Sequence, residues 1–116
     1  MQERRRNVRV RPTADYKVGI DYGTGVVKER LAVLDLAVGG VALVLTDQLA
    51  GLAPGSEIRL EVSLPGVPRF ETVGTLRYTQ GRAGGRCGIH FNHLGHDHQA
   101  QLSRAVSELL ERGSSA

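Results

Sequence analysis

The arginine-rich start of the chain holds the side chains best suited to bind an anion. Residues 2–12 read QERRRNVRVRP and carry five of the fifteen basic residues. Within this stretch, Arg4, Arg5 and Arg9 follow the spacing R-R-x-x-x-R. Arginine stays charged and presents a planar fork of N–H donors, so it suits phosphate oxygens and stacks flat on a nucleobase. The run alone is also typical of a solvated basic terminus or of a nucleic-acid-binding tail.

A second set of residues with useful chemistry lies in the stretch DLAVGG at residues 35–40. Asp35 offers a carboxylate that can accept two hydrogen bonds, for instance from the edge of a guanine base. Gly39 and Gly40 lack side chains, which allows a ligand to approach the backbone closely. A turn-capping carboxylate and a plain glycine turn are the structural alternatives for the same residues.

The elements that must position these residues are β-strands. Apolar and polar residues alternate with a period of two, as in a half-buried strand, most strictly at residues 14–22. Turn residues, mainly glycine and proline, separate the apolar runs. On one expected strand Leu76 and Tyr78 are in phase, and on the last one Cys87 shares its face with other apolar residues. The pattern predicts six strands, at residues 14–22, 26–36, 41–45, 58–64, 70–79 and 87–91.

The period changes near the end of the chain. Five apolar residues between 102 and 110 recur at the i, i+3, i+4, i+7 and i+8 positions of one helix face. This pattern predicts an amphipathic helix at about residues 97–112, capped by Asp97 and ended by Gly113. The fold class that follows is all-β with one helix. Short strands joined by turns favour an antiparallel barrel or a sandwich, with the C-terminal α-helix over an opening or an edge.

Length, charge and cysteine content narrow the class of protein. A chain of 116 residues favours one domain, and its net charge of +3 is a weak indication of an anionic partner. The single cysteine excludes an internal disulfide and fits a reducing compartment. No stretch approaches the roughly 18 apolar residues of a membrane span, and the N-terminus lacks the apolar region of a secretory signal. We therefore expect a cytoplasmic location and no membrane span.

The arginine spacing and the DLAVGG stretch together resemble the PilZ domain family, which comprises bacterial receptors for cyclic di-GMP. The family pattern is R-x-x-x-R near the start, followed later in the chain by D/N-x-S-x-x-G. Arg5 and Arg9 match the first motif, and Asp35 and Gly40 match the second. Ala37 stands where the family motif has serine, so a hydroxyl that would help to hold guanine is missing.

Two later stretches extend the resemblance over nearly the whole chain. RCGIHF at residues 86–91 resembles the closing strand of the family, with His90 at its variable position. GTLRY at residues 74–78 resembles the preceding strand, with Tyr78 where the family often has an aromatic residue. The family fold is a six-stranded antiparallel β-barrel with a C-terminal helix, which agrees with the strand pattern read from the residues.

The resemblance implies a receptor and not an enzyme. A flexible arginine-rich segment at residues 1–12 would become ordered when cyclic di-GMP binds to the domain at residues 13–113, and the changed surface would signal to a partner protein. This interpretation requires no metal, no cofactor and no nucleic-acid partner. The alternative is a degenerate PilZ-like adapter that acts through protein contacts, which the missing serine favours. The residues implied in ligand binding are Arg4, Arg5, Arg9, Asp35, Ala37 and Gly40, with Gly39, Tyr78 and His90 beside them.

Other reactive residues are weaker candidates. His90, His93, His96 and His98 form a loose cluster in which a metal site is conceivable, but Cys87 and His90 fall on opposite strand faces. Cys87 is expected to point into the core with no base beside it, which disfavours a role as nucleophile. No aromatic residue is interleaved with the arginines, so the pattern provides no stacking platform for single-stranded nucleic acid.

Overall fold

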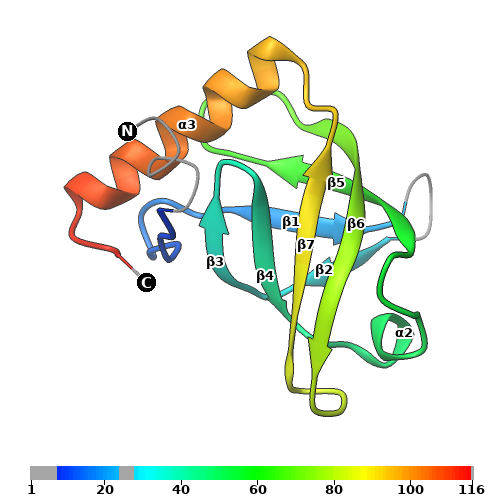
Figure 1. Ribbon diagram of the computed structural model, residues 1–116. Coiled ribbons are helices and arrows are strands. Elements are labelled where there is room, and N and C mark those ends of the chain that lie inside the picture. The colour runs from blue at the N-terminus through cyan, green and yellow to red at the C-terminus, as the bar shows by residue number, and fades with distance from the viewer. Residues whose placement is uncertain (1–7, 24–27, 116) are drawn as a thin grey trace.

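The protein folds as one antiparallel sheet that curls into a nearly closed barrel (Figure 1). The computed structural model describes residues 8–23 and 28–115. Its elements are β1 (Gly19–Tyr22), β2 (Glu29–Leu31), β3 (Val33–Ala37), β4 (Gly40–Val44), α2 (Asp47–Ala50), β5 (Glu57–Ser63), β6 (Phe70–Gln80), β7 (Arg86–Asn92) and α3 (His96–Glu111). The strand order is β2-β1-β5-β6-β7-β4-β3, and every neighbouring pair is antiparallel. The predicted class, a β-barrel with a C-terminal helix, is confirmed.

The barrel closes where two strands that are consecutive in the sequence form the two edges of the sheet. β2 and β3 lie at opposite ends of the strand order, yet only Ala32 separates them in the sequence. β2 pairs with β1 and β3 pairs with β4, while the carbonyl of Ala32 accepts a hydrogen bond from Val44 N at 2.9 Å. The strand expected at residues 26–36 is therefore one bent segment that forms two strands. This is why the sheet has seven strands where six were predicted.

Two further elements differ from the prediction. The strand expected at residues 14–22 pairs with its neighbours over β1 alone, because Thr13 and Tyr16 close a tight turn with reciprocal backbone hydrogen bonds of 3.3 Å. The short helix α2 follows β4, between the strands expected at residues 41–45 and 58–64, where no helix was predicted. The Thr46 hydroxyl caps it by accepting a hydrogen bond from Leu49 N at 3.3 Å, and Leu49 itself is fully buried.

Helix α3 lies across one end of the barrel and contributes its apolar face to the core (Figure 1). Its N-cap is Gly95 and not the predicted Asp97, which lies in the first turn. Gly113 adopts a positive φ of 76° just past the last turn and ends the helix as predicted. Leu110, expected on the apolar face, is 40% exposed. The buried residues of α3 are Leu102, Ala105, Val106 and Leu109.

Residues 8–12 lie against the barrel. Val10 is fully buried, exchanges backbone hydrogen bonds of 2.9 and 2.8 Å with Leu36 on β3, and forms a bridge with Ser115. This attachment places Arg9 at the β3 edge of the sheet. The division into a flexible segment and a domain stays a prediction. Within the described part of the chain, no helix combines the length and the apolar character that a membrane crossing requires.

Candidate functional site

A groove on the outer surface of the barrel brings together most of the residues predicted to bind a ligand. Its volume of about 780 Å³ falls within the range typical of small-molecule sites. Residues of β3, β4, β6 and β7 line it, together with the segment that joins β7 to α3. Arg4 and Arg5 lie outside the described residues. Of the other predicted residues, the groove is lined by Arg9, Ala37, Gly39, Gly40, Tyr78 and His90.

Small residues leave room for this groove on the outside of the sheet. Backbone pairing aligns Asp35 with Ala42, Ala42 with Gly88 and Gly88 with Tyr78 across β3, β4, β7 and β6. The two neighbours of Gly88 along β7 are buried in the core, so Gly88 faces outward. A Cβ on Gly88 would overlap the ring of Tyr78, so the ring lies over this glycine. The row of aligned residues, Asp35, Ala42, Gly88 and Tyr78, therefore carries a carboxylate at one end and an aromatic ring at the other.

A β-bulge directs Tyr78 toward the groove. The register between β6 and β7 shifts between Leu76 and Tyr78, which leaves Arg77 as an extra residue on β6. Leu76 is fully buried in the core, and in an unbroken strand Tyr78 would face inward beside it. The expectation that these two residues share a face is therefore wrong. Arg77 is exposed and also lines the groove, and the sequence reading missed it because a bulge interrupts the alternation on which that reading depends.

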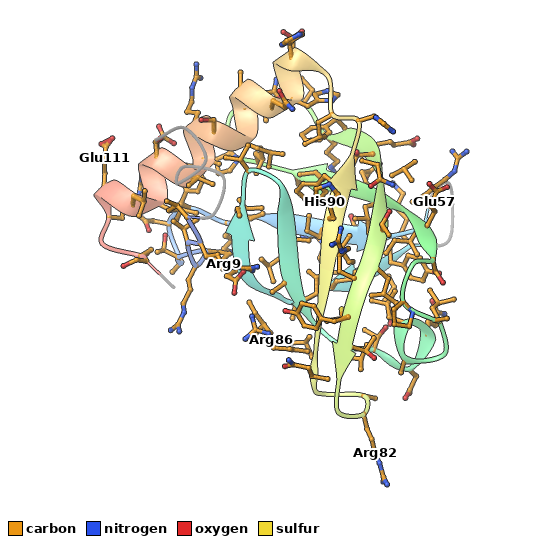
Figure 2. The ribbon with its side chains drawn as sticks, viewed as in Figure 1. Arg9, Glu57, Arg82, Arg86, His90 and Glu111 are labelled. Atoms are coloured by element: carbon orange, nitrogen blue, oxygen red, sulfur yellow. The ribbon has the colours of Figure 1, made fainter. Side chains whose placement is uncertain are left out.

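Two arginines hold the carboxylate of Asp35. Asp35 lies on β3 and is only 6% exposed. Its Oδ1 accepts a hydrogen bond from Arg9 Nη1 at 2.8 Å, and its Oδ2 accepts one from Arg86 Nη2 at 3.0 Å. In Figure 2 the two arginine side chains point toward one another beside β3. A buried carboxylate is stable only when it is paired and hydrogen-bonded, and these contacts supply that pairing. The alternative of a turn-capping carboxylate does not apply, because Asp35 lies within a strand.

Arg86, which binds Asp35, was not predicted from the sequence. The period of two along β7 places Arg86 on the same outer face as Gly88 and His90, and this spacing could have revealed it. The adjacent hydroxyl of Tyr78, followed by the charge of Asp35, raises the pKa of Arg86 against a lowering by burial. Its Nε is buried and has no hydrogen-bond partner among the described residues. The link from Arg86 to Asp35 therefore runs through Nη2.

Gly39 and Gly40 have different surroundings. A Cβ on Gly40 would overlap the carbonyl oxygen of Ile89, so this glycine allows β4 to lie against β7. A Cβ on Gly39 would meet no atom of the described residues within 4 Å. Packing of the barrel therefore requires Gly40, a reason beyond the expected approach of a ligand. Gly39, by contrast, has no packing reason to be glycine and borders open groove space.

The histidines near the groove and the single cysteine form no second reactive centre in residues 8–23 and 28–115. This part of the chain contains no group of three or more His, Cys, Asp or Glu side chains placed to hold a metal ion. His98 instead stacks on Phe70, with ring centroids 3.9 Å apart. Cys87 is fully buried as expected, and burial raises the pKa of its thiol, so it lacks the exposure and thiolate character of a nucleophile.

This combination of barrel, helix and sequence motifs is that of a known family. The family model for the PilZ domain matches residues 3–108. The chain belongs to the PilZ domain family. In this PilZ domain the second family motif forms the β3–β4 hairpin, with Asp35 and Ala37 on β3 and Gly40 at the start of β4. The first motif is described only at Arg9, which lies against Asp35 of the second.

Several solved structures share the fold. The PilZ domain of YcgR from Escherichia coli, solved with c-di-GMP, superposes with a TM-score of 0.68 at 19% identity, covering 94% of both chains. The MrkH–c-di-GMP complex from K. pneumoniae superposes with a TM-score of 0.71 at 17% identity, covering 94% of this chain and 54% of MrkH. The inhibitor of motility MotI/DgrA from Bacillus subtilis superposes with a TM-score of 0.68 at 21% identity, covering 90% of this chain and 51% of that protein.

These comparisons establish the shared fold. The chain spans about half the length of MrkH and of MotI/DgrA. Comparison with curated protein sequences finds no match.

Proposed function

We propose that this PilZ domain is a receptor for cyclic di-GMP, which binds in the outer groove and orders the arginine-rich segment for recognition by a partner protein. The observation that carries the proposal is the meeting of the two family motifs, because Arg9 of the first donates a 2.8 Å hydrogen bond to Asp35 of the second at the edge of the groove. Support also comes from YcgR and MrkH, which have the same fold and were solved in complex with c-di-GMP.

The groove, together with Asp35 beside its lining residue Arg9, offers a partner for each chemical group of the dinucleotide. Arg9 supplies a charged guanidinium for a phosphate oxygen or for the face of a guanine. Arg4 and Arg5 precede it in the sequence and would add further charge. Asp35 would accept hydrogen bonds from the N–H groups on a guanine edge. The ring of Tyr78 would offer an aromatic face to a base.

The floor of the groove lacks one group of the family motif. Ala37, Gly39 and Gly40 line it, and His90 pairs with Gly40 across β4 and β7. The hydroxyl of the motif serine is absent at Ala37. Since a neutral hydrogen bond contributes about 0.5–1.5 kcal/mol net, its absence weakens binding by about threefold to tenfold. We therefore infer a site of reduced affinity and not an abolished one.

The proposed mechanism is a switch between a free and an ordered arginine segment. Such a receptor acts in the cytoplasm and requires no catalytic group, metal, cofactor or nucleic acid. The alternative function is a PilZ adapter that acts through protein contacts without binding the nucleotide usefully, and the specific observation in its favour is Ala37.

Isothermal titration calorimetry with cyclic di-GMP tests the proposal. We expect the wild type to bind at micromolar concentration or below. Arg9→Ala should lower the affinity at least tenfold, because hydrogen bonds to charged groups are worth roughly 1.5–3 kcal/mol. Arg82→Ala is the matched control, because it removes the same charge from the β6–β7 loop, where Arg82 points away from the barrel (Figure 2). It should bind like the wild type.

The opposite result is equally informative. A folded wild-type protein that releases no heat and shows no binding by a second method would overturn the receptor proposal. It would favour the adapter, and the next experiment would be a search for protein partners by pull-down.

A further inference from the structure

The two arginines that bind Asp35 come from distant parts of the chain, and each contacts a different oxygen of its carboxylate. Arg9 lies 26 residues before Asp35 and contacts Oδ1, whereas Arg86 lies 51 residues after it and contacts Oδ2. The side chain of Asp35 is 8% exposed, so the carboxylate has little access to water. Among the described residues, each carboxylate oxygen therefore has one arginine as its charged donor.

The two arginines are held in different ways. Arg86 begins β7, and its backbone pairs with Val44 on β4 and with Gln80 on β6. Its guanidinium also lies beside the hydroxyl of Tyr78, whose proximity raises the pKa of Arg86. Arg9 precedes Val10, which is fully buried and forms isolated bridges with Leu36 and Ser115, and the Arg9 side chain is 51% exposed against 41% for Arg86. Arg86 thus belongs to a strand, whereas Arg9 lies outside the strands on a segment that isolated bridges hold.

The proposed ligand would compete with Asp35 for the guanidinium of Arg9. The same Arg9 that donates to Asp35 is the arginine expected to meet a phosphate or a guanine. If Arg9 moves to the ligand, Oδ1 loses this donor and the buried carboxylate loses one of the two cations that the described residues supply. The N–H groups on a guanine edge could replace the lost donor, but a neutral base brings no compensating charge.

We propose that Arg86 is a positioning residue, which keeps Asp35 paired and directed toward the groove while Arg9 transfers from Asp35 to the ligand. This inference rests on the proposed function. Arg86 does not need to touch the nucleotide. It acts through Asp35, and through its contact with Tyr78 it also connects the two ends of the row that crosses β3, β4, β7 and β6.

Calorimetry with cyclic di-GMP on a small set of variants tests this role. Arg86→Gln keeps an N–H donor on a shorter side chain but removes the charge and the Nη2 contact, and it should weaken binding about tenfold, as expected for loss of a hydrogen bond to a charged group. Arg86→Lys keeps the charge and should recover most of the affinity. Arg82→Gln, in the neighbouring loop, should leave it unchanged. If the glutamine variant were unfolded, the lysine variant would carry the test, because it should bind more weakly than the wild type but still bind.

A double-mutant cycle separates positioning from a general structural role. In the Arg86→Gln background Arg9 is the only cation from residues 8–23 and 28–115 that remains on Asp35, so its transfer to the ligand becomes more costly. The loss of affinity caused by Arg9→Ala should then be smaller in that background than in the wild type. If Arg86 only stabilised the fold, Arg86→Gln would lower the unfolding midpoint both alone and together with Arg9→Ala. The loss of affinity caused by Arg9→Ala would then be the same in the wild type and in the Arg86→Gln background.

The outcomes distinguish the two proposals. If the folded wild type does not bind cyclic di-GMP, the receptor proposal fails and the role of Arg86 fails with it. If the wild type binds, and if folded Arg86→Gln and folded Arg86→Lys both bind as tightly as the wild type, only the role of Arg86 is overturned. Additive losses in the cycle would overturn the transfer of Arg9.

Discussion

The ring of Tyr78 lies over Gly88 of the adjacent strand, in space that a Cβ would occupy. This contact exists because the β-bulge after Leu76 turns Tyr78 to the outer face of β6, and because its partner in the β6–β7 ladder has no side chain. A single glycine and one extra residue thus determine that an aromatic ring lies at the groove.

Gly88→Ala should destabilise the protein by about 1–3 kcal/mol, because the new methyl group forces the Tyr78 ring out of its position. Urea unfolding followed by circular dichroism measures this. In a Tyr78→Ala background the same substitution should cost much less, since the overlapping ring is gone. An equal cost in both backgrounds would show that the ring does not depend on Gly88.

Gly40→Ala should lower the stability of the protein, whereas Gly39→Ala should weaken ligand binding with little change in stability. Gly40→Ala should lower the free energy of unfolding by about 1–3 kcal/mol, because its Cβ overlaps the Ile89 carbonyl on β7. Gly39→Ala should change stability by no more than about 0.5 kcal/mol, because nothing lies within 4 Å of its Cβ. It should nevertheless weaken binding of cyclic di-GMP by filling part of the groove. Unfolding curves and titrations of both variants check this, and a Gly39→Ala protein with full affinity would place the ligand elsewhere.

Ala37→Ser should strengthen binding of cyclic di-GMP by about threefold to tenfold, because it restores a hydroxyl worth about 0.5–1.5 kcal/mol net. Calorimetry at matched ionic strength is the measurement. Ala37→Cys controls for size, because a thiol fills similar space but forms weak hydrogen bonds. If serine and cysteine bound alike, the hydroxyl would have no role at this position.

Tyr16 should make the protein less stable at alkaline pH. Burial, followed by the nearby Glu108 carboxylate, raises the pKa of Tyr16 from 10.0 to about 12, although Arg112 and Arg104 oppose the shift. Between these two values the unfolded chain loses the tyrosine proton first. Stability therefore falls as pH rises through this window, by up to about 2–3 kcal/mol.

The variant Tyr16→Phe cannot ionise and should lose less stability over the same window. Urea unfolding of both proteins at about pH 9 and about pH 11 provides the comparison. Parallel losses in the two proteins would assign the alkaline transition to another group.

The sequence by itself was sufficient for most of the elements and for the family. Alternation along β5 and β7 and the helical period of α3 predicted which residues are buried, because burial of one face imposes those periods on any sequence. The arginine spacing and the DLAVGG stretch predicted that Arg9 and Asp35 belong to one site, and in the structure Arg9 Nη1 lies 2.8 Å from Asp35 Oδ1. That this site binds cyclic di-GMP stays a proposal.

Three features depend on the tertiary structure alone. The barrel closes at Ala32, the side chain of Tyr78 faces outward, and Arg86 donates a hydrogen bond to Asp35. The first two depend on which strands pair and in which register, and a one-residue shift in register changes the face of every later side chain. The third joins residues 51 positions apart. Local periodicity carries no information about such a contact, because it arises only when β3, β4 and β7 lie side by side.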